Sequence, residues 1–342
     1  MKAIAIYEHG GPEVLRYVDL PEPEISEEEV LVRLRASALN HMDIFVRRGW
    51  RGLKLSFPHI PGADGAGVVE EVGARVEGVE RGDPVVLNPG LNCGRCEFCL
   101  RGDDSLCVQY GILGEHANGT YAELVRVPGR NVLPMKKGFS FEEAAAIPLV
   151  FMTAWRMLVT GAKVQPGEDV LVLGAGGGVA SAAIQIAALL GARVLATSSS
   201  EEKLKKAQEI GADIVINYRE EPFEKVVWEA TGMRGVDVVV ETVGEATWKK
   251  SLRSLAKGGR LVTCGATTGP MGETDIRLVF WRQLRIIGST MGTRAGLEEV
   301  LDLVWSHRLS PSIHAVLPLE KARDAQVIME SGEHFGKIVL QP

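Results

Sequence analysis

The sequence of 342 residues predicts an α/β protein that combines a β-rich part with a doubly wound parallel sheet. Up to about residue 130, short segments alternate apolar and polar residues, and glycine and proline interrupt them closely. After Gly138, Val/Ile/Leu-rich strand segments alternate with helical ones, as in a parallel sheet covered by helices on both faces. A glycine-rich turn follows the first of these strands.

In the β-rich part, strands are predicted at residues 28–39, 65–76 and 82–88. Residues Asn40–Gly49 predict one short helix, because a polar residue starts the segment and a glycine ends it. Ser140 and Glu143 have capping-box spacing and predict the start of the next helix.

The second part is predicted to alternate strands and helices. The expected strands are residues 168–175, 192–199, 213–218, 236–244 and 260–267, and the expected helices are residues 177–191, 200–211 and 245–259. Residues 280–292 end this series. The tail adds a helix at residues 295–309 and a strand at 336–342, and we expect it to return to the first part.

Composition narrows the functional classes. The chain is 46% hydrophobic and 24% charged, as in ordinary globular proteins. Its net charge of -6 offers no basic surface for nucleic acid. The longest apolar segment, residues 144–155, is too short to span a membrane and contains Pro148. The start lacks the apolar stretch of a signal peptide, so we expect a cytoplasmic protein with reduced thiols and no membrane partner.

The turn "VLVLGAGGGVASAA" predicts a dinucleotide site. Its best match to the glycine fingerprint has Ala175, Gly177 and Ala180 at the key positions, between a buried strand and an Ala-rich helix. Glycine lets the backbone approach a pyrophosphate, and the helix start supplies N–H groups. The alternative is a glycine-rich turn that binds nothing.

The end of the second strand favours NADPH over NAD. An acidic residue there would bind the ribose and repel a 2′-phosphate. This strand instead ends in Ser198, Ser199 and Ser200, with Lys203 one helical turn later. The alternative interpretation is a helix N-cap followed by Glu201 and Glu202 in the first turn.

Four of the five cysteines, Cys93, Cys96, Cys99 and Cys107, form a C-x2-C-x2-C-x7-C cluster. In a reducing compartment this spacing predicts zinc rather than disulfides. Four thiolates close a tetrahedral shell, so the predicted metal is one structural Zn²⁺ per chain. Unmetallated thiols are the alternative. Cys264 stands apart and is expected to be a small buried residue.

With these features, the whole chain resembles the medium-chain dehydrogenase/reductase superfamily. The resemblance lies in the segment 61–86 ("PGADGAGVVEEVG…"), the four-cysteine lobe, "TAW" at 153–155 and "HFGKIVL" at 334–340. It implies a GroES-like catalytic domain formed by residues 1–150 and 292–342. A Rossmann dinucleotide-binding domain, residues 151–291, would be inserted between these segments, with the active site in the cleft between the domains.

The resemblance also implies that the usual catalytic zinc is missing. The family carries its three ligands at positions that here are Asn40, Ala63 and about Leu149, and Asp64 replaces the family's glutamate. An amide is a poor zinc ligand, and alanine and leucine are none. This pattern resembles the zinc-independent quinone oxidoreductases and enone reductases, although most of these lack the cysteine lobe.

The predicted function is therefore hydride transfer from NADPH to a quinone or an α,β-unsaturated carbonyl. Asn40 is the candidate hydrogen-bond donor to the substrate, and by resemblance Thr153 lies beside the nicotinamide. Helix capping and helix packing are their alternative roles. A different class remains open, a chain that holds NADPH or an interaction module, without turnover.

The resemblance implies further cofactor contacts: Gly177, Gly178 and Val179 at the pyrophosphate; Ser199, Lys203 and Tyr218 at the adenosine; Val243, Gly265 and Ala266 at the nicotinamide; Met291 near the domain hinge; and Lys337 at a phosphate or the cleft. Each is alternatively a plain strand-end or core residue. Residues 41–59 are expected to line the substrate pocket, where Phe45, Trp50 and Phe57 favour an apolar acceptor.

Four histidine and aspartate side chains near Asn40 allow two interpretations. His41, Asp43, His59 and Asp64 are the only other local metal ligands, and a zinc held by them would make the chain an alcohol dehydrogenase with non-standard ligands. Otherwise they are structural carboxylates and partly exposed loop histidines.

A homodimer or homotetramer is expected, because residues 282–292 can supply the edge strand of an open sheet.

Overall fold

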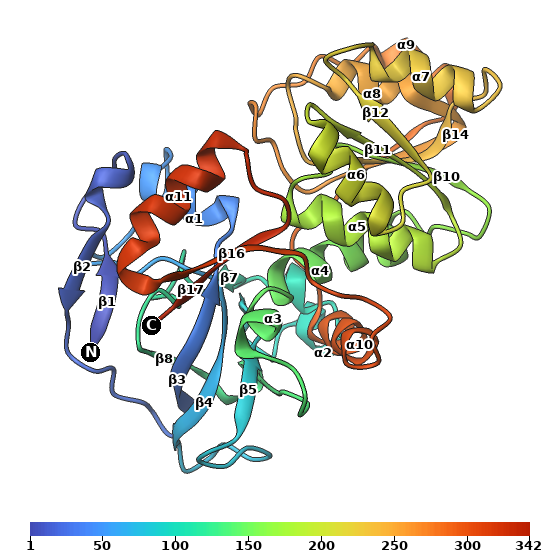
Figure 1. The fold of residues 1–342 in the computed structure, drawn as a ribbon. Coiled ribbons are helices and arrows are strands. Elements are labelled where there is room, and N and C mark those ends of the chain that lie inside the picture. Colours follow the sequence, from blue (N-terminus) through green and yellow to red (C-terminus); the bar gives the residue numbers. More distant parts are fainter. The chain divides into compact units, whose positions relative to one another are not determined.

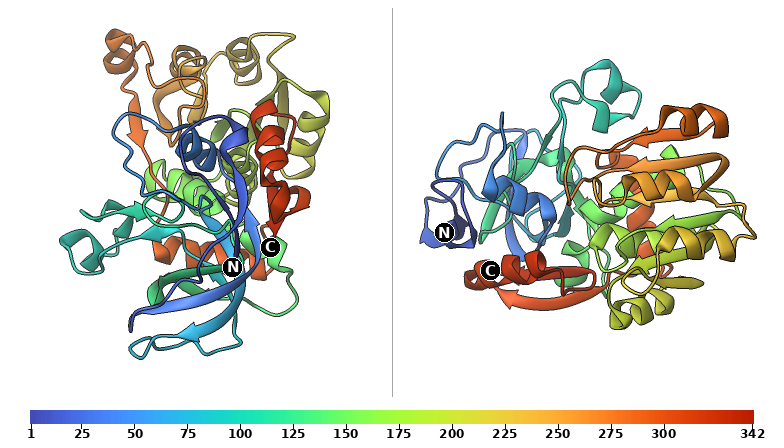
Figure 2. Two further views of the ribbon diagram at one scale, coloured as in Figure 1. Left: turned by 90° about the vertical axis from the view of Figure 1, so that its left-hand side faces the viewer. Right: turned by 90° about the horizontal axis from the view of Figure 1, so that it is seen from above.

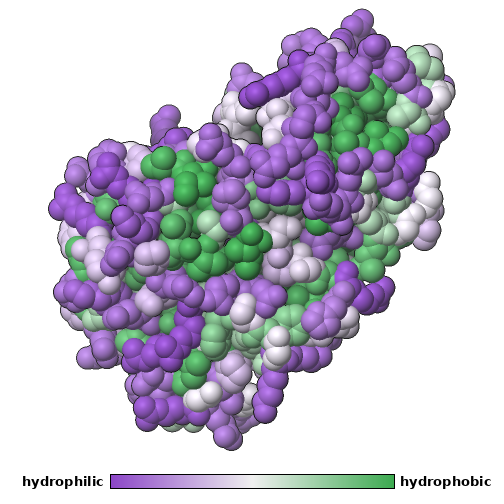
Figure 3. All heavy atoms as spheres, in the orientation of Figure 1, coloured by the Kyte–Doolittle hydropathy of each residue, from purple (hydrophilic) through white to green (hydrophobic).

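A computed structural model describes residues 1–342 and separates them into two compact units. Unit 1 comprises Met1–Leu149 and Thr293–Pro342, and unit 2 comprises Val150–Gly292 (Figure 1). No helix in the structure is both long enough and apolar enough to cross a bilayer. The face drawn in Figure 3 is mostly hydrophilic, with apolar atoms gathered in a few patches.

Unit 1 is built on a seven-stranded sheet in which β16, β17, β3, β4, β5 and β9 follow one another, while β8 also pairs with β3. Its strands are β3 (Glu29–Ala38), β4 (Asp64–Val72), β5 (Pro84–Leu87), β8 (Leu124–Pro128), β9 (Val132–Pro134), β16 (Ile313–Pro318) and β17 (Lys337–Gln341). The three strands predicted in the β-rich part are all present. The tail joins this sheet, because β17 pairs with both β16 and β3.

Two small sheets and five helices complete unit 1. They are β1 (Lys2–Ala5) with β2 (Arg16–Asp19), β6 (Gly90–Leu91) with β7 (Gly111–Ile112), and helices α1 (His41–Arg48), α2 (Glu97–Leu100), α3 (Phe141–Ala145), α10 (Arg294–Trp305) and α11 (Ala322–Ser331). Short 3-10 turns lie at Pro12–Val14, Asp104–Leu106, Gly129–Asn131 and Leu319–Lys321. Helix α1 matches its prediction, with Asn40 as N-cap and Gly49 as C-cap at φ 74°.

Unit 2 contains a six-stranded parallel sheet in the order β12-β11-β10-β13-β14-β15. The strands are β10 (Asp169–Val172), β11 (Arg193–Ser198), β12 (Ile214–Asn217), β13 (Val236–Glu241), β14 (Leu255–Thr263) and β15 (Arg285–Gly288). This order confirms the predicted doubly wound sheet. The order reverses between β10 and β13, the place where such sheets bind ligands beyond the carboxyl ends of the strands.

The helices associated with unit 2 are α4 (Pro148–Trp155), α5 (Gly178–Leu189), α6 (Glu201–Glu209), α7 (Phe223–Ala230), α8 (Trp248–Ser254) and α9 (Ile276–Arg282). A π-helical turn, Arg156–Gly161, directly continues α4. Figure 2 shows helices flanking the sheet. The Ser140–Glu143 capping box is present at α3, and a new helix, α4, begins at Pro148.

Two details depart from the sequence prediction. The helix predicted at residues 245–259 stops at Ser254, because Leu255 already pairs with Val236 as the first residue of β14. Helices α7 and α9 were not predicted, and neither were β16 and α11 in the tail. In β16 the exposed and partly buried positions simply alternate, so this short edge strand has no strong apolar signal.

Candidate cofactor, zinc and substrate sites

The turn after β10 leaves the start of α5 open. Gly174 adopts φ 68°, and its N–H donates to Thr197 Oγ1 at 3.3 Å. Helix α5 begins at Gly178, and its N-cap Gly177 has no side chain to cap it. The N–H groups of the first turn therefore have no partner within the helix. The structure gathers Gly177, Gly178 and Val179 at this point, and their backbone suits a pyrophosphate.

The turn after β13 lies next to this glycine turn. A Cβ on Gly174 would stand 3.9 Å from Val243 Cγ2, so the two loops meet where the strand order reverses. The end of β14 adjoins them, because a Cβ on Gly265 would stand 3.1 Å from Thr242 O and one on Gly244 would stand 2.9 Å from Ala266 Cα. The structure thus brings together Val243, Gly265 and Ala266.

A buried carboxylate that the sequence analysis missed holds this turn. Glu241 is fully buried and accepts hydrogen bonds from the N–H groups of Val243 (2.8 Å) and Gly244 (3.0 Å). The hydroxyls of Thr247 and Ser251 also donate to it, at 2.9 and 2.5 Å. The only sequence signal was an acidic residue directly after the apolar run Val238–Val240 at the end of the strand.

Thr153 on α4 carries a buried hydroxyl with no hydrogen-bond partner. The residue is 4% exposed. Helix α4 packs against the segment that follows β15, since a Cβ on Gly292 would stand 2.7 Å from Met152 O. Met291 precedes that glycine and has φ 51°, a left-handed conformation uncommon outside glycine. An unpaired buried hydroxyl is unusual and points to a missing partner such as a ligand.

The end of β11 presents serines while nearby carboxylates bind elsewhere. Glu201 accepts from Asn217 Nδ2 at 2.7 Å, and Glu202 accepts from Lys206 Nζ at 2.6 Å. Ser200 is the N-cap of α6 but makes no side-chain cap bond. The remaining serine of the predicted set, Ser199, lies between these elements, and Lys203 lies in the first turn of α6.

Tyr218 is brought to the same edge of the sheet. Its N–H donates to Ser198 O at 3.1 Å, and its ring is 49% exposed. The aromatic face is therefore available to a ligand at the carboxyl ends of β11 and β12.

In unit 1, a buried lysine organises the neighbourhood of Asn40. Lys337 Nζ donates to Leu39 O (2.7 Å), Asn40 Oδ1 (2.7 Å) and Asp64 Oδ2 (3.0 Å). Asn40 Nδ2 also donates to Asp64 Oδ2, at 2.9 Å. The other Asp64 oxygen accepts from Leu149 N at 2.9 Å. We call Lys337, Asp64 and Asn40, together with the Leu149 N–H, the Lys337 cluster.

This cluster changes two sequence interpretations. All three N–H bonds of the Lys337 ammonium are engaged and the residue is 2% exposed, so none is left for a phosphate. The Asn40 amide is 5% exposed and already donates to Asp64, so it has no well-placed free N–H for a substrate. Its alternative role is visible, because Asn40 is the N-cap of α1.

The alternative metal ligands in unit 1 do not gather. His59 is a buried residue rather than a partly exposed one, and its Nε2 lies 2.9 Å from Gly114 O. Asp64 pairs with the Lys337 ammonium, a cation that already occupies the position beside this carboxylate. The ring of His41 packs 6.2 Å from that of His334. The only group of three or more potential ligands that converges is the cysteine cluster, so this part of unit 1 does not fit a metal.

Asp43 is an internal acid with an abnormal pKa. Its Oδ2 accepts from the Asn40 N–H at 2.8 Å and from the Tyr121 hydroxyl at 2.9 Å, and Oδ1 has no partner. Burial raises the pKa of Asp43 to about 7, although these two donors oppose the rise.

The cysteine cluster fits zinc. The Sγ atoms of Cys93, Cys96, Cys99 and Cys107 all lie within 4.8 Å of one another. The Cys96–Cys99 and Cys93–Cys99 sulfurs are 3.5 and 4.0 Å apart, and a tetrahedron with Zn–S bonds of about 2.3 Å requires roughly 3.8 Å. Two backbone N–H groups also donate to Cys107 Sγ at 3.3 Å, which stabilises a thiolate.

The lobe around these cysteines has little core of its own. Helix α2 buries none of its residues, and Leu100 and Val108 are 76% and 69% exposed. Asp104 joins the lobe to α10, because its carboxylate accepts from Arg294 N at 3.1 Å. With so little apolar burial, a bound ion would be the main source of order in the lobe.

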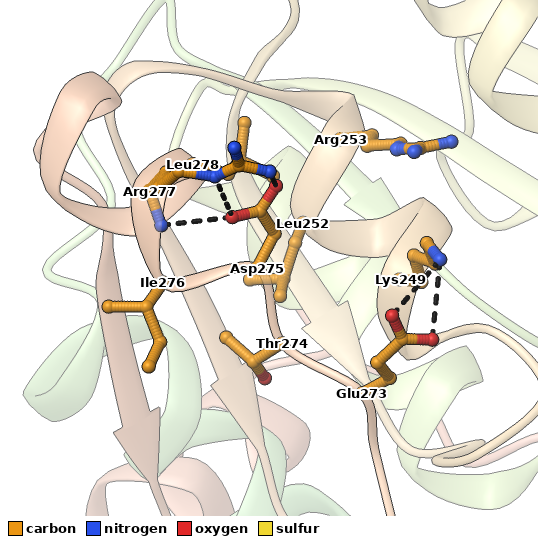
Figure 4. A pocket seen from close by; sticks show the side chains of 9 residues that line it. All are labelled: Lys249, Leu252, Arg253, Glu273, Thr274, Asp275, Ile276, Arg277 and Leu278. Atoms are coloured by element: carbon orange, nitrogen blue, oxygen red, sulfur yellow. Dashed lines mark hydrogen bonds and ion pairs between the residues drawn. The ribbon is translucent and has the colours of Figure 1, made fainter.

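A large groove on unit 2 lies away from these residues. It encloses about 770 Å³ between α8 and the segment 273–278. Figure 4 shows two charge pairs in it, Lys249 with Glu273 and Arg277 with Asp275. None of the predicted cofactor residues lines it. The predicted aromatic pocket residues lie on unit 1, where Phe45, Trp50 and Phe57 are 38%, 45% and 42% exposed.

The chain is similar to known proteins with three different activities, namely alcohol dehydrogenases, an acryloyl-coenzyme A reductase and quinone oxidoreductases. Residues 26–137 match the alcohol dehydrogenase GroES-like domain, and residues 178–306 match the zinc-binding dehydrogenase family. The chain is 35% identical to an alcohol dehydrogenase of Geobacillus stearothermophilus, over 100% of this chain and 99% of the relative. It is 30% identical to an acryloyl-coenzyme A reductase of Sulfurisphaera tokodaii, over 100% of both chains.

The chain is also 30% identical to a human quinone oxidoreductase, over 99% of this chain and 97% of the relative. Among solved structures, an NAD-dependent alcohol dehydrogenase is 50% identical, with a TM-score of 0.97 and full coverage of both chains. These similarities agree with the predicted pairing of a GroES-like part and a Rossmann part.

We predict that Cys107→Ser abolishes zinc binding, because three thiolates cannot close the tetrahedral shell. Elemental analysis of protein purified without added metal should give about one zinc per wild-type chain and none for the variant, with a lower Tm. Cys264→Ser, at the fifth cysteine, is the control and should keep its zinc. Two zinc ions per wild-type chain would contradict the assignment.

We predict that Asp43 makes the protein less stable as pH rises. The folded pKa of Asp43 is about 7, and an unfolded aspartate has a pKa of about 3.9. Between these values the folded chain binds a proton that the unfolded chain lacks, so the free energy of unfolding falls with pH, by up to about 1.4 kcal/mol per pH unit. Urea titrations from pH 4 to pH 7 should show this decline in the wild type.

Asp43→Asn should flatten that decline, because the amide cannot ionise. The exposed Asp19→Asn is the control and should leave the slope as it is. An unchanged slope in Asp43→Asn would show that another group controls the pH dependence.

Proposed function

This chain belongs to the medium-chain dehydrogenase/reductase superfamily, and from that premise we propose that it reduces a quinone or an α,β-unsaturated carbonyl with NADPH. It is an NAD(P)-dependent oxidoreductase, as its relatives are. The Lys337 cluster is the observation that favours reduction of a quinone or an enone over metal-dependent alcohol oxidation. A Lewis acid that polarises an alcohol needs an open metal site, and an ammonium bonded to Asp64 stands in its place.

The nucleotide would lie along the carboxyl edge of the unit 2 sheet. Gly178 and Val179 would hold the pyrophosphate through their N–H groups. Gly177, whose own N–H donates to Gly174 O at 2.9 Å, would let the phosphate approach because it has no side chain. Val243, Gly265 and Ala266 would flank the nicotinamide, on a turn that Glu241 keeps rigid. Met291 would end this cradle, and when bound the dihydronicotinamide supplies the hydride.

Conjugate reduction places negative charge on an oxygen of the acceptor, and one buried donor can stabilise it. We propose the Thr153 hydroxyl for this position, because it is buried and has no partner in the protein. Asn40 would shape the substrate side of unit 1 through its fixed amide rather than by donating a hydrogen bond. Phe45, Trp50 and Phe57 would offer apolar contacts to a quinone ring or an enone.

NADPH is proposed over NADH because the tip of β11 carries no carboxylate. Ser199 and Lys203 would meet the 2′-phosphate, and Tyr218 would stack near the adenosine. Glu201 and Glu202 bind Asn217 and Lys206, so neither needs to face that phosphate.

An alcohol dehydrogenase is the second candidate. Its support is the naming of the relatives, including a solved NAD-dependent alcohol dehydrogenase at 50% identity. It would require a second metal built from ligands that do not converge in unit 1. Alcohol oxidation with NAD⁺ that a chelator abolishes, in a protein with two zinc ions, would favour it over the reductase.

We also propose a homodimer formed through β15. This strand ends the unit 2 sheet, so its outer N–H and C=O groups lack a strand partner. Ile286 on β15 and Phe280 and Trp281 on α9 are 42%, 63% and 77% exposed. Two copies of this edge can pair across a two-fold axis and bury these side chains.

Thr153→Val should lower kcat for quinones and enones by roughly 10²-fold, because the valine keeps the shape but cannot donate to the oxyanion. Thr153→Ser is the matched control and should keep most of the activity. NADPH oxidation with a panel of both acceptor classes is the measurement. Equal rates for wild type and the valine variant would remove Thr153 from the mechanism, and no turnover of any acceptor would overturn the proposed function.

Ser199→Asp should lower kcat/KM for NADPH at least about tenfold and leave that for NADH unchanged or raised, because a carboxylate repels the 2′-phosphate. Ser306→Asp adds the same charge at the exposed end of α10 and should alter neither value. A wild type that prefers NADH would contradict the cofactor assignment before any variant is made.

Ile286→Lys should convert the dimer to monomers, because a lysine ammonium on an edge strand opposes strand pairing and the burial of its neighbours. Val316→Lys is the control, since Val316 is 43% exposed on β16, the edge of the other sheet. Analytical ultracentrifugation would distinguish them. A wild type that sediments as a monomer would end the proposal.

A further inference from the structure

The ion pair between Lys337 and Asp64 is almost free of solvent. Their side chains are 3% and 0% exposed. The other deeply placed pair of unit 1, Arg47 with Glu330, leaves 19% of the glutamate exposed. Taking two full charges out of water costs several kcal/mol per ion before their attraction is counted, and apolar residues often pack as well in such places. The fold therefore calls for a second reason to keep this pair.

That reason lies in what the pair connects. Its hydrogen bonds join the β3–α1 junction at Leu39 and Asn40, the start of β4 at Asp64, the start of α4 at Leu149 and the start of β17 at Lys337. These segments are far apart in the sequence. A single ammonium and a single carboxylate thus fix four chain segments at one point.

The contact at Leu149 acts on a helix start. Its N–H belongs to the first turn of α4, whose donors have no partner inside the helix. A carboxylate at this end is favoured by the helix dipole as well as by the hydrogen bond of 2.9 Å. Thr153 follows Leu149 by four residues and so projects from the same side of the helix.

Both carboxylate oxygens of Asp64 and the amide oxygen of Asn40 accept hydrogen bonds. Asp64 Oδ1 accepts from Leu149, while Oδ2 accepts from both Lys337 and Asn40. The Asn40 amide is held at both ends, with its oxygen on Lys337 and its nitrogen on Asp64. Neither side chain can rotate without breaking a charged hydrogen bond in a dry environment.

We propose that Lys337 and Asp64 are positioning residues, which lock the Asn40 amide and the first turn of α4 in place without a metal. In this chain the pair ties together the stretches at Asn40, Ala63–Asp64 and Leu149, where the sequence analysis found metal-ligand positions filled by residues that cannot ligate. The kinetic consequence rests on the proposed function, in which α4 presents Thr153 to the acceptor.

The first test is a double-mutant cycle on stability. Lys337→Met leaves a buried carboxylate without its cation, and Asp64→Ala leaves a buried ammonium without its anion. Each should lower the urea midpoint strongly, whereas the double variant K337M/D64A should recover part of the loss because no unpaired charge remains. Strict additivity of the two losses would overturn the proposed pairing.

The second test measures the position of α4 directly. Amide hydrogen exchange at Leu149 should be at least about tenfold faster in K337M/D64A than in the wild type, because the N–H loses its acceptor and the helix start frays. The double variant R47M/E330A removes the other buried pair and is the matched control. It should lower stability but leave exchange at Leu149 unchanged, and equal rates at Leu149 in all three proteins would overturn the positioning role.

The third test is kinetic. K337M/D64A should lower kcat for the acceptor about tenfold or more with the KM for NADPH within about twofold, and Thr153→Val should cost less in this background than in the wild type. In the R47M/E330A background Thr153→Val should keep its full effect. A wild-type kcat in K337M/D64A would overturn the positioning role while leaving the proposed function intact. If the wild type reduces no acceptor, the proposed function fails, and the exchange result alone judges the cluster.

Discussion

A buried ammonium sets the geometry of unit 1. Once Lys337 has been taken out of water, each of its N–H bonds must find an acceptor. The fold supplies a backbone carbonyl and an amide oxygen from the neighbouring residues Leu39 and Asn40, and a carboxylate from Asp64. The carboxylate in turn needs donors for its remaining lone pairs, which brings in Asn40 Nδ2 and the Leu149 N–H. Each polar group at this point thus satisfies the requirement that no buried charge stay unpaired, and the bonds hold α1, β4, α4 and β17 together where the sheet pairing has brought them.

In unit 2, the topology of the backbone brings the turns of the candidate site together. Parallel strands end at one edge of the sheet, so the turns after β10, β13 and β14 gather there without any long-range side-chain contact. The side chains that matter act on these turns. Glu241 secures one through four donors, and Gly174 allows another through its positive φ. The dinucleotide site that we propose at these turns would therefore follow from the topology, with a few local hydrogen bonds fixing the turns.

The chemistry of the side chains distinguishes the two places where zinc was considered, the cysteine cluster and the surroundings of Asn40. The four cysteine sulfurs converge within 4.8 Å of one another in a lobe with hardly any core, and thiolates in this arrangement fit zinc. Around Asn40 the polar groups are an amide, a carboxylate and an ammonium. The amide and the ammonium both donate to the carboxylate, so these groups are already paired with one another. One chain can thus combine a cysteine cluster that fits zinc with a second polar cluster whose groups are paired with one another and do not fit the ion.

Sequence periodicity predicted the elements whose apolar pattern is strong, such as β10, β11, β13 and α5. It missed β16 and α11, whose pattern is weaker, and it extended α8 into β14 because "LAKGG" continues a helical spacing while Leu255 is claimed by pairing with Val236. The residue types at Asn40, Ala63 and Leu149 were enough to argue against a catalytic metal. The partner that fills the gap was not predictable, because Lys337 lies about 270 residues from Asp64 and only the pairing of β17 with β3 brings it there.

The close approach of Gly292 to Met152 has a consequence for the origin of this architecture. The chain enters unit 2 at residue 150 and leaves it at 292, and the entry and exit segments touch each other. A module whose two ends coincide can be spliced into a surface loop of a host without pulling the host apart. Unit 1 keeps its own sheet, its own core and its internal ion pair on either side of that splice. Unit 2 therefore meets the geometric condition for a domain that was inserted into the chain of another domain.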